Sequence, residues 1–174
     1  MKTSPKARIK RQFHRTYEHQ KKRMQQCRDR ARLEDISELL GTFERASIDY
    51  KVIFDDYDDL TINTPRNWIQ HNYTFQSWGK INSQPLKNSY VINNVYYENW
   101  VELFNQIIQQ EFLEPQLVYI VWGSQPLLKV QLFDIIEYVP IIFRQYRCTW
   151  IVSPEEGWCI ERNKERDISF LPIN

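Results

Sequence analysis

The chain has 174 residues, a formal net charge of +1 and only four glycines, with 26% charged and 14% aromatic residues. This composition excludes a largely disordered chain and suffices for one domain with a real core, with or without an appendage. No apolar run is long enough to span a bilayer or to form a signal peptide, which predicts a protein of the reducing cytoplasm.

The three cysteines, Cys27, Cys148 and Cys159, do not have the spacing of a metal site. In the strand register given below, Cys148 and Cys159 are offset by two residue pairs, too far for a disulfide. We therefore expect reduced thiols, no metal ion and no cofactor.

The net charge hides two oppositely charged parts. Residues 1–33 carry a charge of +10, whereas residues 34–174 carry −9. The sequence therefore predicts a basic helical N-terminal arm, residues 1–34, and an acidic α/β domain, residues 35–174.

Apolar side chains in the arm recur in steps of three and four, which predicts a long helix over residues 6–32. They are Ile9, Phe13, Tyr17, Met24, Cys27 and Ala31. This stripe could pack on the acidic domain, or the helix could bind nucleic acid or a membrane surface. The membrane alternative is weakened because the stripe is thin and has no Trp or Leu.

Nucleic-acid binding needs clustered Lys and Arg that neutralise phosphates. The candidate residues for this alternative are Lys10, Arg11, Arg15, Lys21, Lys22, Arg23, Arg28 and Arg30.

After the arm, Asp35 and Glu38 have the spacing of a capping box, and Ile36, Leu39 and Phe43 follow at helical spacing. Residues 47–54 alternate between apolar and polar side chains, which predicts a strand with one solvated face.

An acidic segment follows this strand, with four carboxylates in five residues. These charges repel one another and need solvent, a cation or a basic partner. The segment lacks the glycine turn and the distal glutamate of a calcium loop. The segment could therefore be a solvated loop, a surface that binds the chain's own basic arm, or a docking site for a basic protein. The candidate partner-binding residues are Asp55, Asp56, Tyr57, Asp58 and Asp59.

Residues 60–96 are polar and aromatic, and they predict loops with a strand near Tyr73 and Phe75. The clearest helix covers residues 97–110, where Trp100, Phe104 and Ile107 share an apolar face with two neighbours. A strand buried on both faces is expected over residues 117–122.

A short helical pattern over residues 130–137 ends before Pro140, and residues 147–152, 158–162 and 167–171 read as a β-meander. The predicted fold class is thus α/β (α+β). It is a single domain with helices packed on a mixed or antiparallel sheet that ends in this meander, plus the basic N-terminal helix.

Two four-residue turns in the meander would place Trp150 opposite Glu161 and Arg162 opposite Asp167. The predicted core face holds Cys148, Trp150, Val152, Cys159, Glu161, Ile168 and Phe170, and the opposite face holds Ile151, Trp158, Ile160, Arg162 and Asp167. A turn longer or shorter by one residue would invert a strand. Glu161 on an apolar face is interpreted as a structural acceptor for a backbone or Trp N–H.

The C-terminal third resembles small bacterial immunity proteins of contact-dependent inhibition and polymorphic toxin systems. The resemblance is carried by residues 118–122, 149–154, 157–161 and 167–169, with a Trp-x-x-x-Pro turn, an apolar-Glu strand end and a closing Ile-Ser strand. It implies a cytoplasmic antidote that binds a toxin domain and blocks it sterically, without chemistry of its own.

Charge makes this function physically coherent. Nuclease toxins hold phosphates with Lys and Arg, so an inhibitor can present carboxylates where the nucleic acid would lie. The alternative function is a nucleic-acid-binding module that uses the basic helix. An enzyme is not predicted, because His14, His19 and His71 have no evident nucleophile or paired acid beside them in the sequence.

Overall fold

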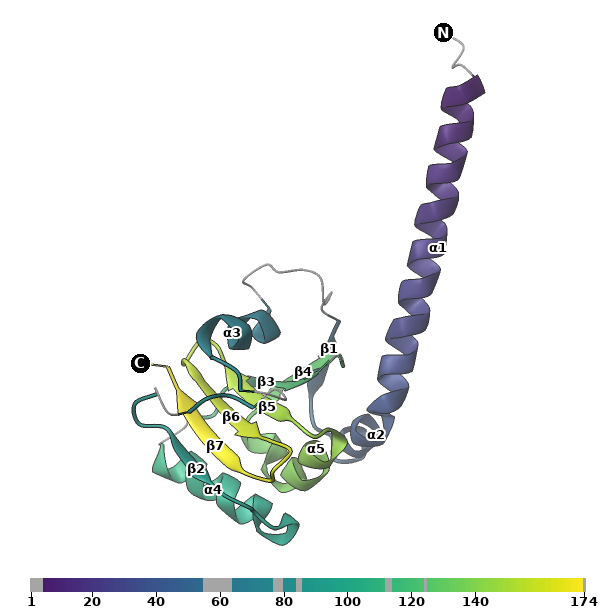
Figure 1. Cartoon of the computed structure of the whole chain (residues 1–174). Helices are drawn as coiled ribbons and strands as arrows, with labels where there is room; N and C mark the ends of the chain where they lie inside the picture. Colours follow the sequence, from purple (N-terminus) through teal and green to yellow (C-terminus); the bar gives the residue numbers. More distant parts are fainter. Residues whose placement is uncertain are drawn as a thin grey trace. The chain divides into compact units, whose positions relative to one another are not determined.

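The computed structural model describes residues 5–54, 64–76, 80–83, 86–111, 114–123 and 125–173, with side chains from Tyr17 onward. The chain divides after Asp35 into two units, here named the arm and the body. The arm is the single helix α1, Pro5–Asp35 (Figure 1). Proline is tolerated at a helix start, and the helix contains no later proline or glycine. The predicted long helix is therefore confirmed.

The body combines helices with one seven-stranded sheet. Its helices are α2 Ser37–Arg45, α3 Pro65–Asn72, η2 Tyr97–Asn99, α4 Trp100–Gln110, η3 Phe133–Tyr138 and α5 Val139–Gln145. Its strands are β1 Tyr50–Ile53, β2 Tyr90–Ile92, β3 Leu117–Trp122, β4 Leu127–Gln131, β5 Thr149–Ser153, β6 Trp158–Arg162 and β7 Ile168–Pro172.

The strands lie in the order β1-β4-β3-β5-β6-β7-β2, and every neighbouring pair is antiparallel. Strands β5, β6 and β7 form the expected C-terminal meander, so the α+β fold class is confirmed. The short strands β1 and β2 occupy the two edges (Figure 1).

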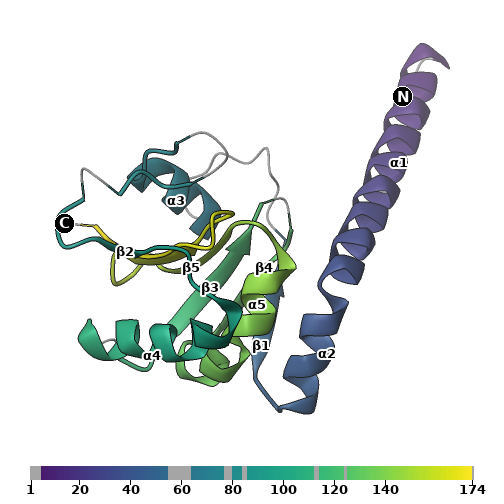
Figure 2. The ribbon, with the colours of Figure 1, turned by 60° about the horizontal axis from the view of Figure 1, so that its bottom comes forward.

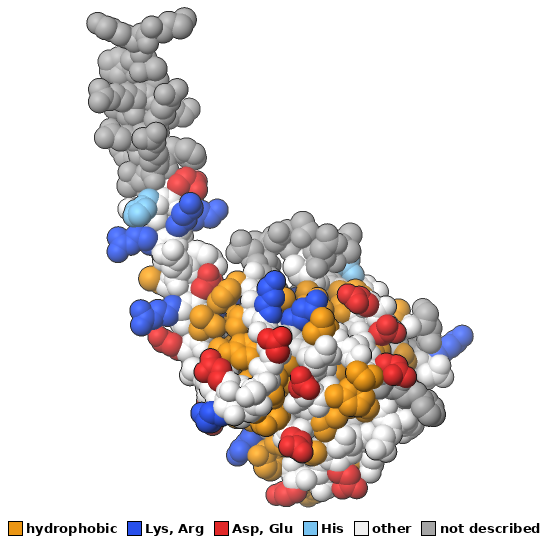
Figure 3. Space-filling model, turned by 180° about the vertical axis from the view of Figure 1, so that it is seen from behind, with side chains coloured by type: hydrophobic (Ala, Val, Ile, Leu, Met, Phe, Trp, Pro, Cys, Tyr) orange, Lys and Arg blue, Asp and Glu red, His pale blue; other side chains and the backbone are white. Residues whose placement is uncertain are grey.

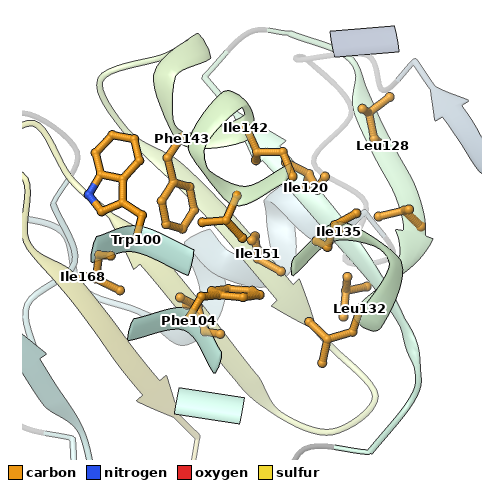
Figure 4. Close-up of a cluster of buried hydrophobic side chains, with 14 of the residues drawn as sticks. Trp100, Phe104, Ile120, Leu128, Leu132, Ile135, Ile142, Phe143, Ile151 and Ile168 are labelled. Atoms are coloured by element: carbon orange, nitrogen blue, oxygen red, sulfur yellow. The ribbon is translucent and has the colours of Figure 1, made fainter. Parts of the chain in front are cut away.

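Both faces of the sheet are covered. Figure 2 shows α3 on one side of the sheet and α4 and α5 on the other. The larger core lies on the side of α4 and α5, where Trp100, Phe104 and Phe143 stack edge to face at 5.7 and 6.2 Å (Figure 4). Sheet residues such as Ile151 and Ile120 close this core from the other direction.

The smaller core lies under α3 and the segment that follows it. Ile69 and Tyr73 pack there on Val121, Val152 and three more buried residues of the sheet. The hydroxyl of Tyr73 donates a 2.6 Å hydrogen bond to the carbonyl of Leu171. The central strands therefore bury both of their faces, as predicted for residues 117–122.

The predicted register is correct for one pair of the meander and wrong for the other. Trp150 faces Glu161 across a four-residue turn, as expected. The β6–β7 loop has five residues, 163–167, so Arg162 faces Ile168 instead of Asp167. One extra residue inverts the strand. Ile168 and Phe170 accordingly lie in the larger core with Ile151 and Ile160, and the face predicted to be the main core carries the smaller one.

Three elements depart from the sequence interpretation. Helix α3 begins at Pro65 with the side chain of Thr64 accepting from the Asn67 N–H, in a region expected to be loop. Strand β2 lies in the same region. Val130 belongs to strand β4 rather than to a helix, and Pro140 stands in the first turn of α5, where it does not interrupt the helix.

Candidate functional site

The predicted partner-binding residues Asp55, Asp56, Tyr57, Asp58 and Asp59 lie outside the described residues. Their assignment stays a prediction.

The predicted nucleic-acid-binding residues of the arm are exposed where their side chains are described. These are Lys21, Lys22, Arg23, Arg28 and Arg30. Lys10, Arg11 and Arg15 belong to α1, but their side chains are not among those described. Arg30 lies 3.4 Å from Glu34, a pair exposed to solvent on both sides and therefore worth little stability.

A polar cluster joins the β6–β7 loop to distant segments of the body. Lys80 Nζ lies 2.9 Å from Asp167 Oδ2 and 2.8 Å from Glu165 Oε2, and the backbone N–H of Asn94 donates to Asp167 Oδ1 at 3.0 Å. Burial alone would raise the pKa of Asp167, but the hydrogen bonds from Lys80, Asn94 and Asn163 outweigh it and lower the pKa. These non-covalent contacts hold the β6–β7 loop to the segments that contain Lys80 and Asn94, so the role of the cluster is structural.

Glu161 is the buried acid beside this cluster. Its Oε1 accepts from the backbone N–H of Ile81 and from the indole N–H of Trp150, each at 3.0 Å. The interpretation of Glu161 as a structural acceptor is thus confirmed. Burial raises its pKa to about 7, although both hydrogen bonds act in the opposite direction.

Exposed carboxylates gather on the side of the body that α4 covers. Glu98 and Glu102 lie on η2 and α4, and Asp134 and Glu137 lie on η3, which packs against α4. All four are exposed, and we name them the acidic face. Phe133 beside them is 42% exposed. Figure 3 shows acidic side chains spread over one face of the body with hydrophobic side chains between them.

A hollow of about 440 Å³ lies where α4 ends, and we name it the acidic hollow. Three carboxylates line it: Glu111 and Glu114 after α4, and Glu156 in the β5–β6 turn. Trp158 and Phe170 form an aromatic wall, with ring centroids 6.3 Å apart. Residues from four separate stretches of sequence thus meet in one place.

The rim of the acidic hollow is fixed by backbone contacts. Gly157 adopts a φ of +73°, a conformation that glycine takes without strain, and its N–H donates to the carbonyl of Ser153 at 2.9 Å. The N–H of Ile173 donates to the carbonyl of Gly157 at 2.6 Å. These contacts fix Gly157, the residue after Glu156, beside the end of β7.

A second hollow, of about 230 Å³, lies on the opposite side of the sheet. Its wall is mainly apolar, with Ile69, Phe75, Val121 and Trp150, and Arg66 stands at its edge. Arg66 Nη2 donates to the carbonyls of Trp122 and Gln125, at 3.1 and 2.7 Å. This arginine is thereby engaged in holding α3 to the end of β3.

Within the described parts of the chain, no group of three or more His, Cys, Asp or Glu residues has a geometry that could hold a metal ion. His71 bonds the carbonyl of Asn67 one turn back in its own helix, at 2.7 Å. No described helix is long and apolar enough to cross a membrane. Cys27, Cys148 and Cys159 form no disulfide bond.

Comparison with models of protein families, with curated proteins and with solved structures finds no match to this chain.

Sequence reasoning missed the acidic hollow. One signal was present: residues 88–128 contain no Lys or Arg, while they contain four glutamates. The pattern indicates local negative charge. It gives no hint that Glu156 and Trp158, far along the chain, join two of those glutamates at a single site.

Proposed function

We propose that this protein is an immunity protein that binds a cognate toxin domain, most simply a nuclease, and neutralises it sterically in the cytoplasm. The observation that carries the proposal is the acidic surface of the body: the acidic face has the exposed side chains of Tyr97 and Phe133 beside it, and the acidic hollow adds three more carboxylates where α4 ends. Exposed carboxylates speed the encounter with a basic protein, and aromatic side chains supply contact area that slows its release.

The charges on this surface are available to a partner. None of Glu98, Asp134 and Glu137 forms an ion pair with a described residue. Tyr97 is 42% exposed, and the guanidinium of Arg144 lies 4.5 Å from its ring centroid. A nuclease that holds phosphates with Lys and Arg is complementary to such a surface.

The test is co-expression with the toxin domain encoded next to this protein in its own genome. Cells that make the toxin alone should stop growing, and cells that also make this protein should grow. The purified pair should form a stable complex in which the toxin's activity is lost in proportion to the protein added. Failure to protect cells together with failure to bind the toxin would exclude this function.

The exposed Lys and Arg side chains of α1 favour a second function, the binding of nucleic acid. A helix that contacts several phosphates releases counterions, so the logarithm of its affinity falls with the logarithm of salt concentration, by roughly 0.9 per phosphate on duplex DNA. Titration of a DNA duplex and an RNA hairpin at several salt concentrations tests this function. The matched variant replaces Lys21, Lys22, Arg23, Arg28 and Arg30 with Gln and should bind more weakly and with a smaller salt dependence.

A further inference from the structure

We propose that the arm forms a coiled coil with an acidic amphipathic helix of another protein. The surface that makes this contact is a stripe of exposed side chains on α1, with basic residues along both of its borders. The immunity function proposed above depends on the body, so the coiled coil neither requires that function nor excludes it.

The described turns of α1 carry one narrow stripe of residues, which we name the seam. Its members follow one another at alternating steps of three and four residues, as the a and d positions of a heptad repeat do. They are Tyr17, Gln20, Met24, Cys27 and Ala31, and all of them are exposed. Tyr17 is 62% exposed and Met24 is 58% exposed. In a coiled coil, the partner helix packs over residues at these positions.

The charges of the arm are sorted about the seam. The e and g positions flank the seam of a coiled coil, and between residues 17 and 31 all of them are basic. They are Lys21, Arg23, Arg28 and Arg30. The remaining basic residue of this stretch, Lys22, lies on the outer side of the helix, and so do both of its acids, Glu18 and Asp29. Contact with phosphates requires clustered Lys and Arg but no such sorting, so the pattern favours a helical partner over nucleic acid.

The e and g charges also determine which helix can cover the seam. In a parallel coiled coil the g residues of one helix face the e residues of the other, and in an antiparallel one each position faces its own kind. Two copies of the arm would therefore bring basic side chains together in either orientation, which disfavours a second copy of this chain as the partner. A helix with Glu or Asp at its e and g positions would form ion pairs instead.

The arm itself offers these bases little compensation. Lys21, Arg23 and Arg28 form no ion pair with a described residue. Arg30 pairs with Glu34 at 3.4 Å, but the two side chains are 83% and 70% exposed. Such an exposed pair contributes little stability and can be exchanged for a pair with a partner. An acidic helix would thus neutralise the borders of the seam while it covers the side chains of Tyr17 and Met24.

The direct test uses two fluorescently labelled synthetic peptides of about four heptads, with Ile at a and Leu at d. The acidic peptide has Glu at every e and g position, and the basic peptide has Lys there. Fluorescence anisotropy during titration with the full chain, in reducing buffer at physiological salt, measures the affinity. The wild type should bind the acidic peptide saturably and should not bind the basic peptide.

The matched variants are Arg23→Glu and Lys22→Glu, which change neighbouring residues and alter the net charge equally. Glutamate is a good helix former, so both variants should keep α1 helical, and circular dichroism checks this. Arg23→Glu replaces an attraction at the border of the seam with a repulsion and should weaken binding of the acidic peptide about 5-fold or more. Lys22→Glu lies on the outer side and should change the affinity by less than about 2-fold, because salt screens distant charges.

Reversal of all four border charges should exchange the specificity. The quadruple variant is Lys21→Glu, Arg23→Glu, Arg28→Glu, Arg30→Glu. It should no longer bind the acidic peptide and should bind the basic peptide, which no loss of folding could produce. Met24→Asp, in the seam, should weaken binding of the acidic peptide although it leaves the border charges unchanged.

Three results would overturn the coiled coil with an acidic helix. The first is a wild type that does not bind the acidic peptide saturably, or equal weakening by Arg23→Glu and Lys22→Glu. The second is a wild type that is dimeric by light scattering and becomes monomeric on Met24→Asp, which would assign the seam to a second copy. The third is binding of duplex DNA without binding of the acidic peptide, which would make the arm a nucleic-acid surface.

Discussion

The indole N–H of Trp150 on β5 donates a 3.0 Å hydrogen bond to Oε1 of Glu161, the residue directly opposite it on β6. The backbone N–H of Ile81 donates to the same oxygen. The other oxygen, Oε2, is buried and has no hydrogen-bond partner within the described residues. The carboxylate thus ties the segment at Ile81 to the sheet, but its charge is poorly compensated.

This geometry predicts an unusual dependence of stability on pH. Burial raises the pKa of Glu161 in the folded protein from 4.5 to about 7. Below the lower value the group is protonated in both states. Between the two values the unfolded chain has lost the proton while the folded chain keeps it, so the contribution of Glu161 to stability falls as pH rises through this window.

We therefore expect the free energy of unfolding of the wild type to fall from about pH 5 to about pH 8 relative to that of Glu161→Gln, which cannot ionise. Urea unfolding of both proteins at the two pH values measures the difference. Glutamine can still accept from Trp150 and Ile81, so the comparison isolates the charge. If the free energies of unfolding of the two proteins change with pH in the same way, Glu161 does not have a raised pKa in the folded protein.

The contact between Lys80 and Asp167 predicts a loss of stability on Lys80→Met. The side chain of Asp167 is only 8% exposed, so removing Lys80 leaves a largely buried carboxylate with fewer partners. The expected cost is roughly 1–3 kcal/mol. The control Lys51→Met removes an exposed lysine of β1 and should change stability by less than about 0.5 kcal/mol. Equal midpoints of urea unfolding for the two variants would show that the contact between Lys80 and Asp167 does not stabilise the fold.

These two contacts also show what the sequence could and could not predict. The helix at α4 and the β5–β6 pair were predictable, because helical spacing and a four-residue turn are local features. The β6–β7 loop was not, since its fifth residue, Asp167, is held by Lys80 and Asn94, which lie more than 70 residues earlier in the chain. No pattern within the meander itself reports these partners.

Other departures have equally specific causes. Val130 and Phe133 stand three residues apart and imitate a helix, although Val130 belongs to β4 and Phe133 begins η3. Thr64 followed by Pro65 is a recognisable helix start, but the polar residues around it favour a loop. The acidic hollow could not be predicted from the sequence for another reason: only the tertiary fold brings its carboxylates and its aromatic wall together.

The observed register of β7 places Phe170 in the larger core, so we expect this side chain to contribute to stability. Phe170 is 3% exposed and lies in the larger core between Tyr90 and Trp158. Phe170→Ala should therefore cost about 3–5 kcal/mol of unfolding free energy. The same change at Phe133, which is 42% exposed, should cost less than about 1 kcal/mol. Chemical unfolding of both variants tests this, and similar small losses would place Phe170 outside the core.

The last prediction concerns the acidic segment at residues 55–59, which remains the densest run of negative charge in the chain. If the protein is an immunity protein, replacing Asp55, Asp56, Asp58 and Asp59 with Lys should slow association with the toxin. Exposed charges steer the encounter more than they hold the complex. The association rate at low salt should fall by about 10-fold or more, with a smaller change in the dissociation rate.

The control for this variant reverses four exposed acids elsewhere on the body, and thus changes the net charge equally. They are Glu38, Glu44, Asp49 and Glu155. Stopped-flow or surface-binding kinetics of both folded variants at low and high salt separate local steering from overall charge. An unchanged association rate in the first variant, with protection of cells intact, would remove residues 55–59 from the binding surface. The acidic face and the acidic hollow would then have to supply the steering, because they carry the exposed carboxylates that both variants retain.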